Sequence, residues 1–177
     1  MPITIVATPN DPLANSFETL AEAEAYMATR PGADAWNDAD DEQKKAALVM
    51  GTRVLSMGFP WTGTATTATQ ALVWGRLGMY SATGYPLDGD VIPQQLKDAL
   101  SETALYILQD ATRLADNEAA AQGIKRIKAG SAEIEYQVPT QSTSQSLSRL
   151  IPDIAKSMLV PSWYIATVPS PFIFEAI

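Results

Sequence analysis

The chain has 177 residues, 46% of them hydrophobic, which is enough for one globular domain with a buried core. It has no cysteine, no histidine and no apolar run of roughly 18 residues, so disulfides, thiolate metal sites, histidine-based catalysis and membrane spans are excluded. Twenty acidic against twelve basic residues give a net charge of −8, which opposes nucleic-acid binding unless the basic residues are clustered.

The first predicted element is an N-terminal arm over 1–15, where prolines interrupt a short apolar run that could otherwise form a strand. The arm lacks the pattern of a secretory signal, so we expect synthesis in the cytoplasm. Ser16 or Thr19 is expected to cap a helix that runs to about Thr29, and Thr19 with Glu22 has the spacing of a capping box. The sequence Arg30-Pro31-Gly32 then ends this helix.

A second helix is predicted over 38–58. Its first turn is rich in acidic residues, which the helix dipole favours at that end. Small and apolar residues recur along it at helical spacing and predict one buried stripe, made of Ala47, Met50, Gly51, Val54, Leu55 and Gly58.

Residues 59–91 are predicted to be irregular, because glycines recur throughout and Pro86 lies among them, apart from a possible short strand over 71–74. We interpret the large aromatic residues here as packing anchors for a long loop. Base stacking on single-stranded DNA is the alternative, but stacking platforms line basic grooves and this segment contributes only one arginine. The predicted structural anchors are Trp61, Trp74, Arg76 and Pro93.

The longest predicted helix starts at Pro93, because a helix tolerates proline in its first turn, and ends near Asp116. The apolar residues at helical spacing along it predict a buried face, which comprises Leu96, Ala99, Leu100, Thr103, Ile107, Leu108, Ala111 and Leu114.

A β-hairpin is predicted at about 123–138, where residues alternate between apolar and polar around a turn at Gly130-Ser131. The only basic cluster of the chain, at 125–128, lies here and can pair across the hairpin with Glu133 and Glu135. The acidic balance of the chain therefore indicates solubility, or a surface past which DNA slides without binding.

The last predicted helix covers roughly 146–159 and is started or kinked by Pro152. An extended tail over 160–177 follows, in which three prolines separate aromatic residues. A tail that is so apolar either packs on its own body or docks on another chain. The predicted partner-binding residues are Trp163, Tyr164, Phe172 and Phe174.

No motif for chemistry emerges. The acidic residues at 38–42 do not have the spacing of a calcium loop, and Asp88 and Asp90 flank a glycine as turn residues often do. There is no phosphate-binding glycine pattern. A glycosidase-like pair of carboxylates is possible in principle, but nothing marks one. We therefore expect no enzyme activity, no metal and no cofactor.

Several segments, taken in order, resemble one family of tailed-phage proteins over roughly 16–138. These segments are the opening helix at 17–26, Trp36 with the helix at 46–55, the middle segment at 59–63, 70–76 and 91–93, and the hairpin at 127–136. Gly75 departs from the family pattern, in which a proline is expected. The family is that of head-to-tail connector proteins, also called adaptor or head-completion proteins. Some of its members are labelled DnaT-like single-stranded-DNA-binding proteins.

The resemblance implies a virion protein that forms a homo-oligomeric ring, commonly of twelve copies, beneath the portal. The ring extends the DNA channel, so double-stranded DNA passes through without specific binding, and it docks tail or nozzle proteins. The implied partners are the portal protein, sister subunits and these tail components. Deleting 160–177 is then expected to abolish docking on the portal.

We thus predict a mainly α fold: a small helical bundle with a long irregular loop, a protruding β-hairpin and extended N- and C-terminal arms. The predicted units are the arm at 1–15, a helical connector domain at 16–159 and the tail at 160–177. The predicted function is structural, as a connector. A single-stranded-DNA-binding protein is the alternative, and a carboxylate-dependent hydrolase is the third hypothesis.

Overall fold

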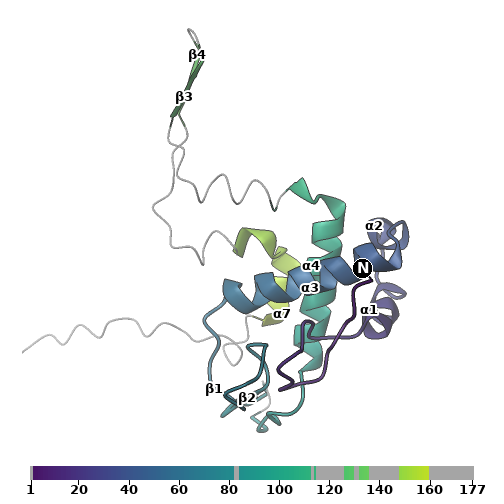
Figure 1. Ribbon diagram of the computed structural model, residues 1–177, viewed down its shortest axis with the longest axis vertical. Helices are drawn as coiled ribbons and strands as arrows, with labels where there is room; N and C mark the ends of the chain where they lie inside the picture. Colours follow the sequence, from purple (N-terminus) through teal and green to yellow (C-terminus); the bar gives the residue numbers. More distant parts are fainter. Residues whose placement is uncertain are drawn as a thin grey trace, which may run out of the picture.

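The computed structural model describes residues 2–81, 84–112, 114, 126–129, 132–135 and 148–159. Its helices in this part of the chain are α1 (Leu20–Met27), α2 (Asp34–Asn37), α3 (Asp41–Gly58), α4 (Gln94–Gln109) and α7 (Asp153–Leu159), with a 3-10 turn η1 (Ser148–Leu150). Two antiparallel strand pairs accompany them, β1 (Thr64–Ala65) with β2 (Arg76–Leu77) and β3 (Arg126–Ala129) with β4 (Ala132–Glu135). The mainly helical fold with a small hairpin is confirmed (Figure 1).

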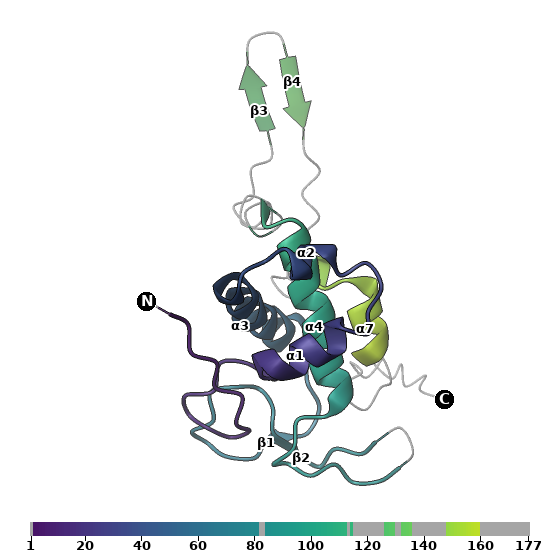
Figure 2. The ribbon, with the colours of Figure 1, turned by 90° about the vertical axis from the view of Figure 1, so that its right-hand side faces the viewer.

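Helix α4 lies at the centre of the body, with α3 on one side of it and α7 on the other (Figure 2). Gly51 allows α3 to approach α4 closely, since a Cβ atom there would lie 2.8 Å from Leu100 Cδ1. The core between the helices is apolar. Its largest fully buried aliphatic side chains are Leu48, Leu55, Leu96, Leu100, Leu105, Ile151 and Leu159.

The helix starts follow local capping chemistry. The predicted capping box of α1 is confirmed, because Thr19 Oγ1 accepts from the Glu22 N–H and Glu22 Oε2 accepts from the Thr19 N–H. Helix α3 has a second capping box, in which Asp40 is the N-cap and Gln43 reciprocates, so the helix starts three residues later than predicted. The short helix α2 was not predicted, and it carries Trp36 into the core.

The predicted stripe of α3 is buried except for Met50, which is half-buried. Helix α4 likewise buries the first part of its predicted face. Two details of α4 differ from the prediction. Pro93 is the N-cap, with φ −61° and ψ 143°, and does not lie within the first turn. The helix ends at Gln109 instead of near Asp116, because Asp110 adopts extended backbone.

The predicted strand over 71–74 is wrong. The strands of this region are β1 and β2, with Thr64 opposite Leu77 and Ala65 opposite Arg76. The Gln70 side chain accounts for the difference, because its Nε2 donates to the carbonyl groups of residues 72 and 75 and its Oε1 accepts from the N–H of residue 67. Side-chain bonds of this kind compete with strand pairing and hold the chain in a bend.

The N-terminal arm lies against the body as irregular chain, without the possible strand near Ile5. The Ile3 N–H donates to Glu42 Oε2 of α3 over 2.6 Å. Asn15 closes the arm on itself, since its Oδ1 accepts from the Val6 N–H and its Nδ2 donates to the Thr4 carbonyl. The bond from Ile3 thus ties the start of the chain to α3, and the two bonds of Asn15 hold the arm itself together.

In the hairpin, the backbone of Lys128 lies opposite Glu133, and that of Arg126 opposite Glu135. Both views show β3 and β4 away from the helices (Figures 1 and 2). Pro152 immediately precedes α7, so it starts this helix. Lys125, the turn at 130–131 and the tail at 160–177 lie outside the described residues.

Candidate interaction surface

The Arg76 guanidinium links two parts of the loop segment 59–91, residues 61–63 and residue 73. It donates hydrogen bonds to the carbonyl groups of Thr62, Val73 at 2.8 Å, Gly63 at 2.8 Å and Trp61 at 3.4 Å. A planar fork of five N–H donors can serve all four carbonyl groups at once, whereas a lysine ammonium has only three donors. Burial lowers the pKa of Arg76 from its ordinary value. Its side chain is thus committed to the backbone of its own loop.

The two tryptophans of the segment pack inward. Trp74 is buried, and its indole N–H donates to the Val91 carbonyl over 3.1 Å. Its ring meets the edge of Trp61 with centroids 5.7 Å apart, and Trp61 meets Phe59 at the same separation. The Trp61 indole N–H donates to the Ser56 carbonyl at the end of α3. Neither ring therefore offers an open platform for a nucleic-acid base.

Removing the Arg76 side chain should loosen this segment. For Arg76→Ala we expect a loss of about 2 kcal/mol in the free energy of unfolding, because several carbonyl groups lose a charged donor. Arg53→Ala is the matched control: this side chain is exposed and forms no hydrogen bond or ion pair in the described part of the chain, so we expect a change within about 0.5 kcal/mol. Urea unfolding of both variants measures the difference, and equal losses would contradict the anchoring role.

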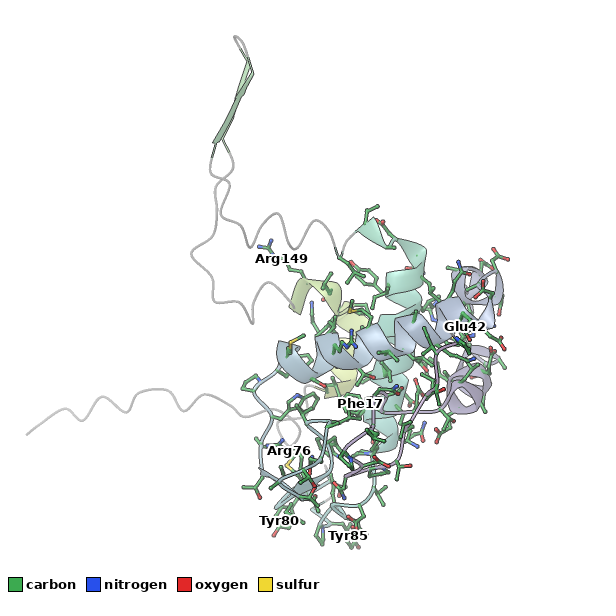
Figure 3. All side chains as sticks on the ribbon, in the orientation of Figure 1. Phe17, Glu42, Arg76, Tyr80, Tyr85 and Arg149 are labelled. Carbon is green, nitrogen blue, oxygen red and sulfur yellow. The ribbon has the colours of Figure 1, made fainter. Side chains whose placement is uncertain are left out.

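The far end of the segment exposes apolar side chains. We call them the tip residues: Leu77, Tyr80, Tyr85 and Val91, which are 48–73% exposed. Figure 3 shows Tyr80 and Tyr85 at one end of the molecule. Their backbone is ordered by local bonds, including Ser81 N–H to the Tyr85 carbonyl at 2.7 Å. Exposed apolar groups on fixed backbone are typical of a surface that contacts another protein.

The acidic residues singled out in the sequence have structural roles. Asp40 caps α3, and Asp41 with Glu42 lies in its first turn. Asp88 Oδ1 accepts from the Asp90 N–H over 3.0 Å, and Asp90 Oδ1 accepts from Asn10 Nδ2 over 2.6 Å. Among the described residues there is no group of three or more acidic side chains placed to hold a metal ion. In the same part of the chain, no helix is long and apolar enough to cross a membrane.

The structure brings together three of the predicted anchors, Trp61, Trp74 and Arg76, in one cluster, and it buries the fourth, Pro93, at the start of α4. The predicted partner-binding residues Trp163, Tyr164, Phe172 and Phe174 lie outside the described residues. The tip residues are not among the residues predicted from the sequence. The available signal was two tyrosines within a glycine-rich loop, a pattern that also fits a buried loop anchor.

The chain matches one protein-family model, described as Putative DnaT-like ssDNA binding protein, over residues 1–168. The match includes every helix and strand described above. No curated protein and no solved structure matches the chain significantly.

Proposed function

The chain belongs to the family described as Putative DnaT-like ssDNA binding protein, and we propose that it acts as a structural head-to-tail connector of a tailed bacteriophage. The observation that carries the proposal is the loop segment 59–91. Arg76 and Trp74 lock this segment internally, yet its tip residues remain exposed. A part that must fit neighbours in a fixed arrangement needs rigid backbone with apolar contact groups at its end.

The resemblance to connector proteins indicates which neighbours this surface contacts. In the proposal, sister copies form a ring of about twelve under the portal, in keeping with closed symmetry of oligomers. The ring extends the DNA channel, and tail or nozzle proteins bind its other side. The protein then belongs to the virion. The net charge of −8 supports a role in lining the DNA channel, since an acidic surface repels the phosphates of passing double-stranded DNA and does not bind them.

A charge placed at the tip tests the proposal. Tyr85 is 73% exposed, so Tyr85→Asp should leave folding intact and disrupt contacts between proteins. We expect native mass spectrometry to show a multi-copy ring, alone or with portal, for the natural chain and a loss of that ring for the variant. The control is Ala21→Asp, an exposed position in the first turn of α1 where an acid is favoured. A chain that stays monomeric with portal present would refute the connector role.

Binding of single-stranded DNA is the second candidate, and the family match favours it. Tyr80 and Tyr85 are exposed rings on which bases could stack. The acidic balance and the inward tryptophans weigh against it. Fluorescence anisotropy with a labelled oligonucleotide separates the two candidates: salt-sensitive binding near micromolar concentrations would establish the second, and we expect none at physiological salt.

A further inference from the structure

A cleft of about 260 Å³ opens between the N-terminal arm, the second half of α3 and the bend before Trp74. It is separate from the tip residues. Its lining mixes small, apolar and polar side chains with one cation, namely Ala14, Asn15, Thr52, Arg53, Ser56, Met57, Ala71 and Leu72. Such a mixture is typical of a groove that holds an extended peptide by apolar contact and fixes it with a charge.

Arg53 is the distinctive member of this lining. Within the described residues it has no hydrogen bond and no ion pair, whereas Lys44 and Lys97 each pair with a glutamate of α1. Met57 lies one helical turn further along α3 and is 54% exposed, so an exposed cation and an exposed apolar group stand side by side. Leu13, next to Ala14 of the lining, is 76% exposed. Among the described residues, the cleft thus presents a cation without a partner next to exposed apolar side chains.

The tail at 160–177 has the complementary chemistry. Its only side chain that is charged at neutral pH is that of Glu175, which directly follows Phe172-Ile173-Phe174. Eighteen residues beyond Leu159 span up to roughly 60 Å when extended, which exceeds the size of a small domain. The carboxylate of Glu175 is opposite in charge to Arg53, and the three apolar residues before it suit the apolar side chains next to Arg53 in the cleft.

We propose that this cleft binds residues 172–175 of the tail from a neighbouring copy, with Glu175 against Arg53 and the aromatic side chains on Met57 and Leu72. This inference rests on the proposed ring. Figure 2 shows α7, from which the tail departs, and the N-terminal arm, which borders the cleft, on opposite sides of α4. Opposite faces of one subunit meet between neighbours in a closed ring, so each tail reaches the next cleft.

Charge reversal tests the pairing in the full chain. Arg53→Glu and Glu175→Lys should each raise the protein concentration for half-maximal assembly about tenfold, and the double variant should restore it. Arg149→Glu, at an exposed arginine on η1, is the control and should assemble normally. Assembly unaffected by either single reversal would overturn the inference, as would a loss that the double variant does not restore. If Arg53→Glu instead abolishes oligonucleotide binding while assembly persists, the cleft holds a phosphate and the inference is wrong.

Disulfide trapping identifies which copy donates the tail. The chain has no cysteine, so Met57→Cys with Phe174→Cys provides the only two thiols. Under oxidation we expect a ladder of covalently linked subunits on a non-reducing gel. A cross-linked monomer would show that the tail folds onto its own cleft and would overturn the inference. A ring without cross-links would overturn it but leave the connector role standing, whereas the absence of any ring would remove both.

Discussion

Replacing Arg30 by alanine is expected to lower the free energy of unfolding by about 4 kcal/mol, the largest loss for any single ion pair described here. Arg30 Nε and Nη2 each donate to one carboxylate oxygen of Glu102 over 3.0 Å, and Tyr26 donates to the same group over 2.8 Å. The Glu102 side chain is only 2% exposed. Truncation of Arg30 therefore leaves the Glu102 carboxylate of α4 buried without its counter-charge.

The same cluster explains two shifted pKa values. The hydrogen bonds to Glu102 raise the pKa of Arg30, so the cation persists at every accessible pH. Burial, together with the bond to Glu102, raises the pKa of Tyr26, so its hydroxyl stays protonated and continues to donate. Both donors are thus permanent, and only mutation can leave the carboxylate unpaired.

Lys97→Ala is the matched control, because it breaks a second ion pair of α4, the one between Lys97 and Glu22 of α1. Its partner Glu22 is 42% exposed, so the expected loss is below about 1 kcal/mol. The double variant Arg30→Met with Glu102→Leu removes both the guanidinium and the carboxylate, so it should recover most of the stability that Arg30→Ala loses. Urea unfolding measures all three variants. A loss for Arg30→Ala no larger than that for Lys97→Ala would show that water solvates the carboxylate.

Local chemistry made much of the fold predictable. A capping box needs only two side chains three residues apart, so Thr19 and Glu22 indicate the start of α1 without any tertiary contact, although Ser16 is a second possible cap in the sequence. The apolar period of α3 likewise identified its buried stripe. Helix α2 was missed because four residues carry no period, and its Trp36 is held by tertiary packing. The bend at 71–74 depends on side-chain bonds from Gln70, which strand propensity does not register.

The candidate surfaces were harder to predict than the helices. Arg76 was recognised as an anchor because it follows Trp74 within an irregular segment, although its carbonyl partners are scattered along the loop. Whether Tyr85 faces solvent depends on the fold of the whole segment, which no short pattern encodes. Arg53 lies at a polar position of an amphipathic helix, where a solvated role is the ordinary expectation. Its place in a cleft arises only when the N-terminal arm packs beside α3.

Replacing Glu18 is expected to have the second large effect on the free energy of unfolding, and at neutral pH it should raise this free energy, whereas replacing Arg30 lowers it. This carboxyl group is 1% exposed just before α1, and Ser101 Oγ of α4 donates to it over 2.7 Å. Burial raises the pKa of Glu18 to about 8, against the hydrogen bond from Ser101, while the charges of Glu22 and Asp98 raise it further and that of Lys97 lowers it. The folded protein therefore keeps a proton that the unfolded chain releases above its ordinary pKa of 4.5.

Because the unfolded state binds fewer protons between pH 4.5 and about 8, the stability that Glu18 contributes is fully present below this window, falls as pH rises through it and is lost above it. Glu18→Gln keeps the acceptor for Ser101 and removes the titration. We expect it to match the natural chain near pH 4.5 and to exceed it by on the order of 3 kcal/mol at pH 7. Denaturant unfolding at several pH values measures the difference.

Glu22→Gln is the control with the opposite trend. Partial burial acts to raise the pKa of Glu22, but the hydrogen bonds from Lys97 and Thr19 outweigh it and lower the pKa. Glu22 therefore adds stability that is present above the ordinary pKa of 4.5 and is lost as pH falls through the lower folded pKa. Glu22→Gln should lower the free energy of unfolding at neutral pH by only a small amount, because the Glu22 side chain is partly solvated. If Glu18→Gln were also less stable than the natural chain at pH 7, the buried carboxyl would have to be ionised in the fold. In that case Ser101 would stabilise an anion, and the contact between the start of α1 and α4 would strengthen with rising pH instead of weakening.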